Sequence, residues 1–267
     1  MTAPPAAHSL MRQVTSERNL KRAARQCMRR TGAPGTDHTT WHDFRRDMPT
    51  RLAALSAALA DGTWTPAPVR IAEFHAWGKR RSIAIPTVGD RIVHRALRNA
   101  VEPVLEHHAY PPWMFGWHRR AGRHLAIAAA DRHLRSGRPW VVDIDVAAAA
   151  HGVGLEDAVT SVARFVHDGT LLALLRRILA ALPEPLAPGS GLCPMLTNLR
   201  MTPVDQRLAD LAVVRMADNY TIFCTTRPDA ETTYRHLSDL LAAHGMRPAP
   251  AKSKIWRPNP EDLYAAG

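Results

Sequence analysis

The stretch VRMADNYTIFC, from Val214 to Cys224, decides the fold and raises the first question about function. Two β-prone runs flank the polar pair Asp218 and Asn219, which is typical of a β-hairpin. Asp and Asn are common turn residues, so the pair has an ordinary structural explanation. The pair lacks the glycine that a type I′ hairpin favours at its second position, which indicates that it serves another purpose. Asp218 is therefore also a candidate metal ligand.

A second acidic strand is expected upstream, in the run PWVVDIDV from Pro139 to Val146. The period of two places Asp143 and Asp145 on one face of this strand. If the two strands are neighbours, Asp145 and Asp218 converge on a divalent ion. Phosphoryl transfer uses such sites, in which two Mg²⁺ ions about 3.5–4 Å apart activate a 3′-hydroxyl and hold the leaving pyrophosphate. An acid at a strand end can equally cap a helix or face solvent, so the spacing alone leaves both explanations open.

The rest of the chain mixes helices and strands without strict alternation, which predicts an α+β fold. A hairpin is expected from Val69 to Pro86, around a Gly-Lys turn. Helices are expected near residues 49–61, 90–106, 122–135, 155–167, 170–182 and 229–244, with one more ending at Leu208. Pro103 is expected to bend or end the second helix, and Thr170 to cap the fifth. Residues 1–22 are expected to form a flexible N-terminal segment.

Composition indicates a folded and basic protein. The 267 residues are 46% hydrophobic and 22% charged, which are globular values. The formal net charge of +11 favours a polyanionic partner such as nucleic acid, with a general basic bias as the alternative. The excess is concentrated between Arg70 and Arg123. The 3 cysteines and 14 histidines lack the spacing of a disulfide framework or a zinc site. Without a signal peptide or a long apolar run, we expect no membrane partner and a cytoplasmic location.

Seven segments, taken in order, resemble bacterial reverse transcriptases of the group II intron type. The resemblance extends from about Ala23 to Ile255, and the shared order makes it more specific than any single segment. The segments are TGAPGTD (31–37), LADGTWTPAPVR (59–70), KRRSIAIPTVGDRIVHRAL (79–97), FGWHRRAGRHLAI (115–127), WVVDIDVAAAAHGV (140–153), PGSGLCPMLTNL (188–199) and VRMADNYTIFC (214–224).

The resemblance implies a right-hand polymerase, with an antiparallel palm sheet packed on helices. Residues 23–138 would form a fingers-like region and residues 139–267 a palm-like region. Asp145 and Asp218 would be catalytic and would bind Mg²⁺ or Mn²⁺, with the Val146 carbonyl and Asn219 as further ligands. The nucleotide-binding residues would be Lys79, Arg81, Ala150, Gly189 and Ser190. A basic hairpin tip suits a triphosphate, although a solvated charged turn is the alternative for Lys79 and Arg81.

The same resemblance and the charge clustering give candidates for binding an RNA template or an RNA–DNA duplex. They are Arg80, Arg91, Arg119, Arg120 and Arg123. The chain ends soon after the segment AKSKIW (251–256), so we expect no thumb, unless a second chain supplies one.

Several positions depart from the family pattern. Asn219 stands where a second Asp is expected, and a neutral oxygen weakens cation binding. Ala149 and Ala150 stand where two Phe are expected, so ribonucleotides should be discriminated poorly. The other departures are His151 for Asp, Pro188 for Gln and Met216 for Tyr.

Three hypotheses follow from the sequence. The first is an RNA-directed DNA polymerase whose activity is weakened or lost. The second is a noncatalytic protein that keeps the basic platform to bind RNA or a partner protein. The third is a remnant of a mobile element without a selected role.

Overall fold

The computed structural model describes residues 9–30, 32–76 and 78–258. The chain forms two compact units: the first contains residues up to Ala109 together with Ala150–Leu196, and the second contains Tyr110–Ala149 and residues from Thr197 onward. These units differ from the predicted fingers-like and palm-like regions, which meet at residue 138. The chain enters each unit twice, so a single boundary cannot separate them. The functional division into fingers and palm stays a prediction.

The first unit is built around one long helix, α5 (Val88–His108). Its buried face includes Ile92, Val93 and Leu97, and helices α1 and α2 pack against it. The other helices of this unit are α1 (Met11–Thr15), α2 (Glu17–Met28), α3 (Trp41–Arg46), α4 (Met48–Ala60), α7 (Leu155–Ala163) and α8 (Gly169–Ala180).

Four expectations for this unit differ from the structure. Residues 9–22, expected to be flexible, include α1 and the start of α2, because Val14 and Leu20 are fully buried; residues 1–8 lie outside the described residues. Helix α5 continues through Pro103, because burial of residues on both sides of it outweighs the lost hydrogen bond. Helix α8 is capped by Asp168, whose carboxylate accepts from the Leu171 N–H, rather than by Thr170. Helix α7 ends at Ala163, before the predicted His167.

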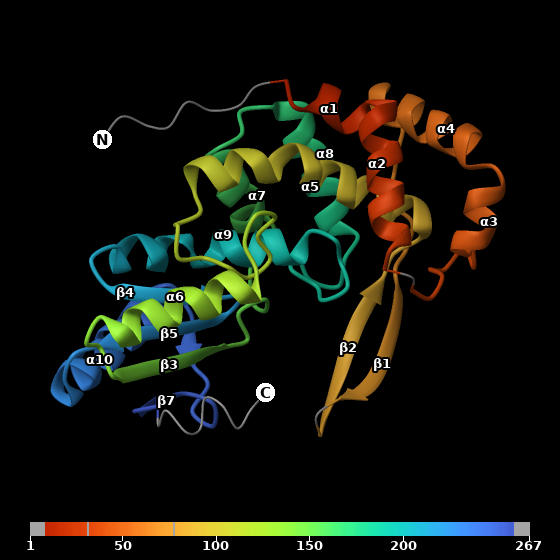
Figure 1. Cartoon of the computed structure of the whole chain (residues 1–267). Helices are drawn as coiled ribbons and strands as arrows, with labels where there is room; N and C mark the ends of the chain where they lie inside the picture. The colour runs from red at the N-terminus through yellow and green to blue at the C-terminus, as the bar shows by residue number, and fades with distance from the viewer. Residues whose placement is uncertain (1–8, 31, 77, 259–267) are drawn as a thin grey trace. The chain divides into compact units, whose positions relative to one another are not determined.

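The predicted hairpin of the first unit is confirmed. Strand β1 (Arg70–Ala76) pairs antiparallel with β2 (Lys79–Ile85), and Gly78 adopts a φ of +71° in the turn. The two strands form a sheet of their own (Figure 1), so large apolar side chains such as Ile71 and Phe74 stay exposed.

The second unit holds a mainly antiparallel sheet in the order β4-β5-β3-β6, with β7 also paired to β3. Helix α6 packs on one face and helices α9 and α10 pack on the other. Successive residues face opposite ways, so Val141 joins the core under α6 while Val142 joins the core under α10. The elements are β3 (Trp140–Ala147), β4 (Ala212–Met216), β5 (Asn219–Cys224), β6 (Arg247–Pro248), β7 (Lys254–Trp256), α6 (Arg123–Arg135), α9 (Cys193–Asp205), a 3₁₀ turn (Gln206–Leu208) and α10 (Arg227–Ala243). The first turn of α9, up to Leu196, belongs to the first unit.

Strand β4 lies at an edge of this sheet, and a preceding segment partly covers it. The Arg215 N–H donates to the Trp113 carbonyl (2.8 Å), and the Phe115 N–H donates to the Arg215 carbonyl (2.8 Å). Residues 113–115 therefore run beside β4 and place Gly116 next to the β4–β5 turn.

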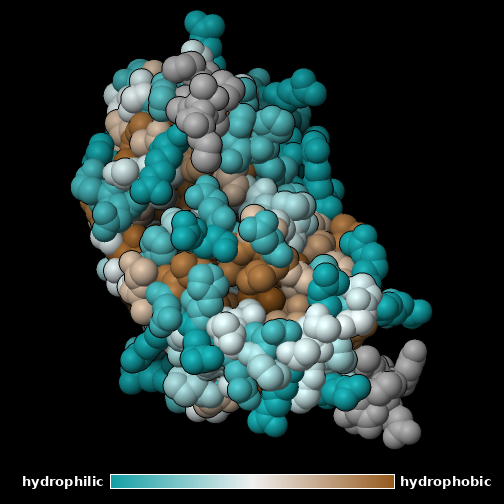
Figure 2. All heavy atoms as spheres, turned by 90° about the vertical axis from the view of Figure 1, so that its left-hand side faces the viewer, coloured by the Kyte–Doolittle hydropathy of each residue, from teal (hydrophilic) through white to brown (hydrophobic). Residues whose placement is uncertain are grey.

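Figure 2 shows hydrophilic residues over most of one face, with hydrophobic residues visible between them. Among the helices of the described residues, none qualifies as a membrane-spanning segment.

Candidate active site

The structure brings Asp145 and Asp218 together within the second unit. Strands β3 and β5 pair so that Asp145 lies opposite Asn219. One residue further along β3, the Val146 N–H donates to the Asp218 carbonyl oxygen, at 2.9 Å. Two acids that are far apart in the sequence therefore lie at adjacent positions where β3 passes the β4–β5 turn, as the strand-pairing argument predicted.

The turn itself is shifted by one residue from the prediction. Met216 pairs with Asn219, so the two turn residues are Ala217 and Asp218, and Asn219 is the first residue of β5. Ala217 adopts a φ of +58°, which is unfavourable for a residue with a Cβ atom. The polar pair suggested a turn at residues 218 and 219, but the register is set by burial of Tyr220 and Ile222 on one face of the strand.

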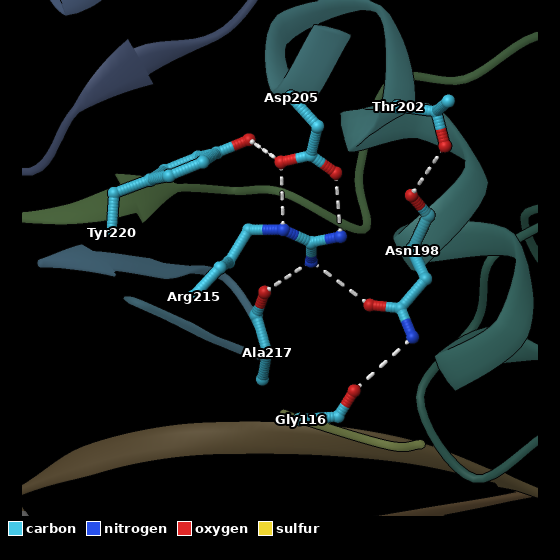
Figure 3. Close-up of polar contacts among 7 residues, drawn as sticks. All are labelled: Gly116, Asn198, Thr202, Asp205, Arg215, Ala217 and Tyr220. Atoms are coloured by element: carbon cyan, nitrogen blue, oxygen red, sulfur yellow. Dashed lines mark hydrogen bonds and ion pairs between the residues drawn. The ribbon is translucent and has the colours of Figure 1, made fainter. Parts of the chain in front are cut away.

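A buried polar network centred on Arg215 holds this turn in place (Figure 3). Arg215 is fully buried and donates from Nε and Nη2 to the two carboxylate oxygens of Asp205, at 2.9 and 2.7 Å. Its Nη1 donates to the Ala217 carbonyl (2.8 Å) and to Asn198 Oδ1 (3.0 Å). The Tyr220 hydroxyl donates to Asp205 Oδ1 at 2.8 Å. One guanidinium thus links helix α9 to the residue that precedes Asp218.

Gly116 also contacts this turn, and its backbone lies so close to Ala217 that no side chain fits at position 116. Its carbonyl oxygen accepts a hydrogen bond from Asn198 Nδ2, at 3.2 Å. A Cβ atom added to Gly116 would lie 1.9 Å from the Ala217 nitrogen. The Asp218 turn therefore rests directly on the backbone of Gly116.

Lys252 is a site residue that the sequence did not indicate. Its Nζ lies 2.9 Å from Asp145 Oδ2, and the Ala249 N–H donates to the Asp145 carbonyl at 2.8 Å. The connection between β6 and β7 holds the lysine there, since both strands pair with β3. The residues of the pair are separated by 107 positions, and no local pattern marks them as neighbours.

Electrostatics favour a cation beside the two acids. Burial raises the pKa of Asp218, and the negative charge of Asp145 raises it further, whereas Lys252 and Arg215 lower it. Carboxylate oxygens are suitable ligands for Mg²⁺, which commonly binds to one or two protein carboxylates together with substrate phosphates. Among the described residues there is no cluster of three or more His, Cys, Asp or Glu side chains that could hold a metal ion. Asp145 and Asp218 are the two carboxylates that the pairing of β3 with the hairpin brings together, and their role as metal ligands stays a prediction.

The neighbouring polar residues have other partners. The Asn219 side chain hydrogen-bonds Asp143 and accepts from the Thr221 hydroxyl, at 3.3 Å. Burial raises the pKa of Asp143, and the hydrogen bonds from Asn219 and Thr221 oppose that shift. The Asn219 amide is thus engaged with Asp143, on the strand that also carries Asp145.

The predicted nucleotide-binding residues lie in the first unit. Arg81 lies on β2 and lines a cavity of about 680 Å³, together with His151 and Pro188. Lys79 begins β2, and its side chain lies outside the described part of the structure. Ala150 follows β3 at the start of the second segment of this unit and is half-buried.

Gly189 and Ser190 hold the loop before α9 against β2. The Ala84 N–H donates to the Pro188 carbonyl, at 2.8 Å. Gly189 has a φ of +98°, and an added Cβ atom would lie 2.1 Å from the Ala84 carbonyl oxygen. Ser190 is buried, and its hydroxyl accepts from the Leu192 N–H at 3.3 Å. These two residues line a different cavity from the one that Arg81 lines.

The predicted nucleic-acid-binding arginines are not gathered on one unit. Arg80 is exposed on the hairpin and forms an ion pair with Glu73. Arg91 is half-buried on α5 and donates to the carbonyls of Pro86 (2.9 Å) and Ala33. The remaining three are exposed in the second unit, at and before the start of α6: Arg119, Arg120 and Arg123.

Comparison with known proteins identifies the family. Residues 73–262 match the family model described as reverse transcriptase (RNA-dependent DNA polymerase). The match covers more than two thirds of the chain and includes the strand that carries Asp145 and the hairpin turn that carries Asp218. The chain therefore belongs to the reverse transcriptase family. Protein YkfC of Escherichia coli (strain K12) is 27% identical over 217 residues, which are 74% of this chain and 56% of that protein. The chain thus spans little more than half the length of this curated relative.

Proposed function

We propose that the chain is an RNA-directed DNA polymerase of the group II intron type, with weakened activity. The reaction would be nucleotidyl transfer to the 3′-hydroxyl of a primer paired with an RNA template. The observation that carries the proposal is the placement of Asp145, on β3, beside Asp218, in the turn of the paired β4–β5 hairpin, in a family that uses such carboxylates.

Asp145 and Asp218 are the residues that would hold Mg²⁺ or Mn²⁺. When bound, such ions lower the pKa of the attacking hydroxyl and stabilise the charge that develops on the phosphates. Arg215 keeps the Asp218 turn in place through the Ala217 carbonyl. Lys252 neutralises part of the charge on Asp145 and competes with a divalent ion for the same oxygen. A divalent ion that binds to Asp145 would therefore have to displace the Lys252 ammonium group, or this group would have to pair with another acceptor.

The departures from the family pattern are the reason to propose weakened activity. Asn219 offers a neutral oxygen, and its side chain already bonds to Asp143. Ala149 is buried in the core where a larger ring is expected, and Ala150 provides little bulk beside an incoming sugar. His151, which stands where an Asp is expected, places its Nδ1 atom 2.6 Å from Glu184 Oε1. We expect poor discrimination against ribonucleotides in any synthesis that occurs.

Primer extension on an RNA template tests the proposal. Reactions with Mg²⁺ and with Mn²⁺ would compare the wild type with Asp145→Ala/Asp218→Ala. Asp239→Ala, an exposed acid on α10, is the matched control. We expect product from the wild type and from the control, and none from the double variant. Absence of product with both metals would refute the polymerase proposal.

A noncatalytic RNA-binding protein is the second candidate function. It is favoured by the Lys252 contact with Asp145 and the Asn219 contact with Asp143, which occupy polar groups that catalysis would need. Its affinity for RNA should fall steeply with salt, because arginine and lysine contacts to phosphate release counterions. Affinity should survive Asp218→Ala and drop when Lys79, Arg80 and Arg81 are all replaced by Ala. Affinity that does not change with salt would exclude this alternative.

A further inference from the structure

Strand β1 of the first unit has an open edge. Within the described part of the chain, β1 pairs with β2 alone, and no loop donates a backbone hydrogen bond to residues 70–76 or accepts one from them. Hydrogen-bonded and non-hydrogen-bonded pairs alternate in an antiparallel ladder, so every second residue of β1 points its N–H and C=O away from β2. This strand of seven residues therefore presents a row of unsatisfied backbone groups.

Large apolar side chains on the same strand are also exposed. Ile71 is 49% exposed and Phe74 is 41% exposed. A two-stranded hairpin on its own is marginally stable in water, whereas three or more strands that share an apolar face are more stable. The hairpin thus has both the backbone groups and the apolar surface to gain from a further strand.

The other edge of the hairpin, on β2, is protected. At the base of β2, the Ala84 N–H donates to the Pro188 carbonyl, at 2.8 Å. At the other end, β2 begins with three consecutive basic residues, Lys79, Arg80 and Arg81. Charged residues on an edge strand oppose pairing with another strand. A further strand is therefore expected beside β1 and not beside β2.

We propose that β1 is a dimerisation strand, which pairs antiparallel with β1 of a second copy of this chain. The result is a four-stranded sheet in the order β2-β1-β1-β2. Two-fold symmetry is the commonest symmetry of soluble homo-oligomers, and it lets one strand pair with itself. The basic β2 strands would form both outer edges, so the assembly ends at two copies. The interface is separate from the proposed polymerase function, because the candidate ligands Asp145 and Asp218 belong to the second unit.

The side chains of β1 favour one register of this pairing. Under two-fold symmetry one residue faces its own copy, and the residue before it faces the residue after it on the other strand. With Phe74 at the centre, two aromatic rings are opposed, and each Glu73 faces His75 of the second copy. Arg80 contacts Glu73 Oε2, so Oε1 is left to accept from an imidazole N–H. A register centred on Glu73 would instead oppose two carboxylates, which is destabilising.

Sedimentation velocity over a range of protein concentrations tests the interface, without nucleic acid and with a chelator. The key variant is Phe74→Lys, which opposes two like charges at the centre of the pairing. The matched control is Ser82→Lys, which adds the same charge to an exposed residue of β2, opposite Glu73. We expect a dimer from the wild type and the control, and roughly tenfold or greater weakening in Phe74→Lys, which loses an aromatic pair and gains a like-charge pair.

Two results would overturn the proposal. One is a wild type that stays monomeric up to its solubility limit, as it would if a strand of another protein occupied this edge. The other is equal association of Phe74→Lys and Ser82→Lys, which would place the contact elsewhere.

A mixture of two variants keeps the test independent of folding. Phe74→Lys and Phe74→Glu should each associate weakly, and their equimolar mixture should form a heterodimer, because residue 74 faces its own copy in this register. A variant that failed to fold could not regain association on mixing, so absence of the heterodimer from two folded variants would contradict the interface. Because these measurements contain neither template nor metal ion, a dimer without primer extension would refute the polymerase proposal alone.

Discussion

At the scale of single residues, Arg215 has the largest structural role. It is fully buried on β4, and its guanidinium contacts Asp205, Asn198 and the Ala217 carbonyl. Breaking a buried pair leaves one charge without a partner, which costs far more than replacing both partners with apolar groups. The network therefore makes the stability of the second unit depend on one side chain.

We expect Arg215→Met to reduce the free energy of unfolding by about 3–5 kcal/mol, because Asp205 would stay buried without its partner. Arg215→Met/Asp205→Leu should recover much of this loss. Urea denaturation measures both, with Arg227→Met in an exposed pair as a control that should change little. A double variant as unstable as the single one would show that the charge pair is not the source of the effect.

The network also shows what the sequence could indicate at this scale. Asp145 and Asp218 were predicted because acids inside apolar, β-branched runs are unusual and fit a known chemistry. Arg215 and Asp205 carry no such signal, since either residue alone is consistent with a solvated position. Their pairing depends on helix α9 packing against the sheet, which only the tertiary structure reveals.

His94 should make stability depend on pH. It is buried on α5, and burial lowers its pKa from 6.5 to about 4, with a smaller contribution from Arg91. Between these two values the unfolded chain binds a proton that the folded chain does not. Stability from this group is therefore present above about pH 6.5 and is lost as the pH falls towards 4.

We expect the wild type to lose about 2 kcal/mol more than His94→Gln when the pH falls from 7 to about 4.5. Denaturant titrations of both proteins at each pH provide the measurement. The comparison cancels the contributions of carboxylates such as Asp143 and Asp218, whose pKa values are raised and shift stability in the opposite sense. Equal losses in the two proteins would mean that His94 is protonated equally in the folded and unfolded states.

At the scale of elements, the β4–β5 hairpin and the segment before α6 together hold Asp218 in position. Residues 113–115 lie beside β4, and Gly116 lies against the turn. The geometry of the candidate site is thus set by a loop that contributes no carboxylate to it.

We expect Gly116→Ala to displace the Ala217–Asp218 turn, because its Cβ atom would overlap the Ala217 backbone. Overpacking of this kind costs about 1–3 kcal/mol. If the polymerase proposal holds, the variant should also lose primer extension while keeping its overall fold. Gly137→Ala tests the general effect of a glycine replacement, since an added Cβ atom there meets no neighbour and disturbs only a positive φ. Full extension by Gly116→Ala would show that the turn position does not matter.

The strands and most helices could be predicted because the spacing of apolar residues in each segment matches the face that the structure buries. Both hairpins follow apolar alternation, and α4, α6 and α10 lie close to their predicted ranges. The wrong predictions fall at positions where tertiary packing, and not the local sequence, determines the secondary structure. Pro103 stays inside α5 because that helix is buried along most of its length, and residues 11–28 form α1 and α2 because both helices pack against α5.

At the scale of the whole molecule, family and fold class were more accessible than the arrangement of the site. Motif order predicted the reverse transcriptase family, and the resemblance to that family implied an antiparallel palm sheet. The sequence assigns Arg81, Gly189 and Asp145 to one site; the first two belong to one unit and Asp145 to the other, so the shared site stays a prediction. A chain that enters each unit twice defeats any assignment by sequence range. Lys252 illustrates the same limit, because its contact with Asp145 depends on β7 pairing with β3.

The partly covered edge of β4 bears on how the molecule behaves among its own copies. Arg215 already uses both its backbone N–H and its carbonyl on residues 113 and 115. A strand from a second molecule needs a continuous row of unsatisfied backbone groups, and this row is interrupted. Edge-to-edge association and fibril growth through β4 therefore require the 113–115 segment to peel away first, so the loop that positions Asp218 also guards against aggregation.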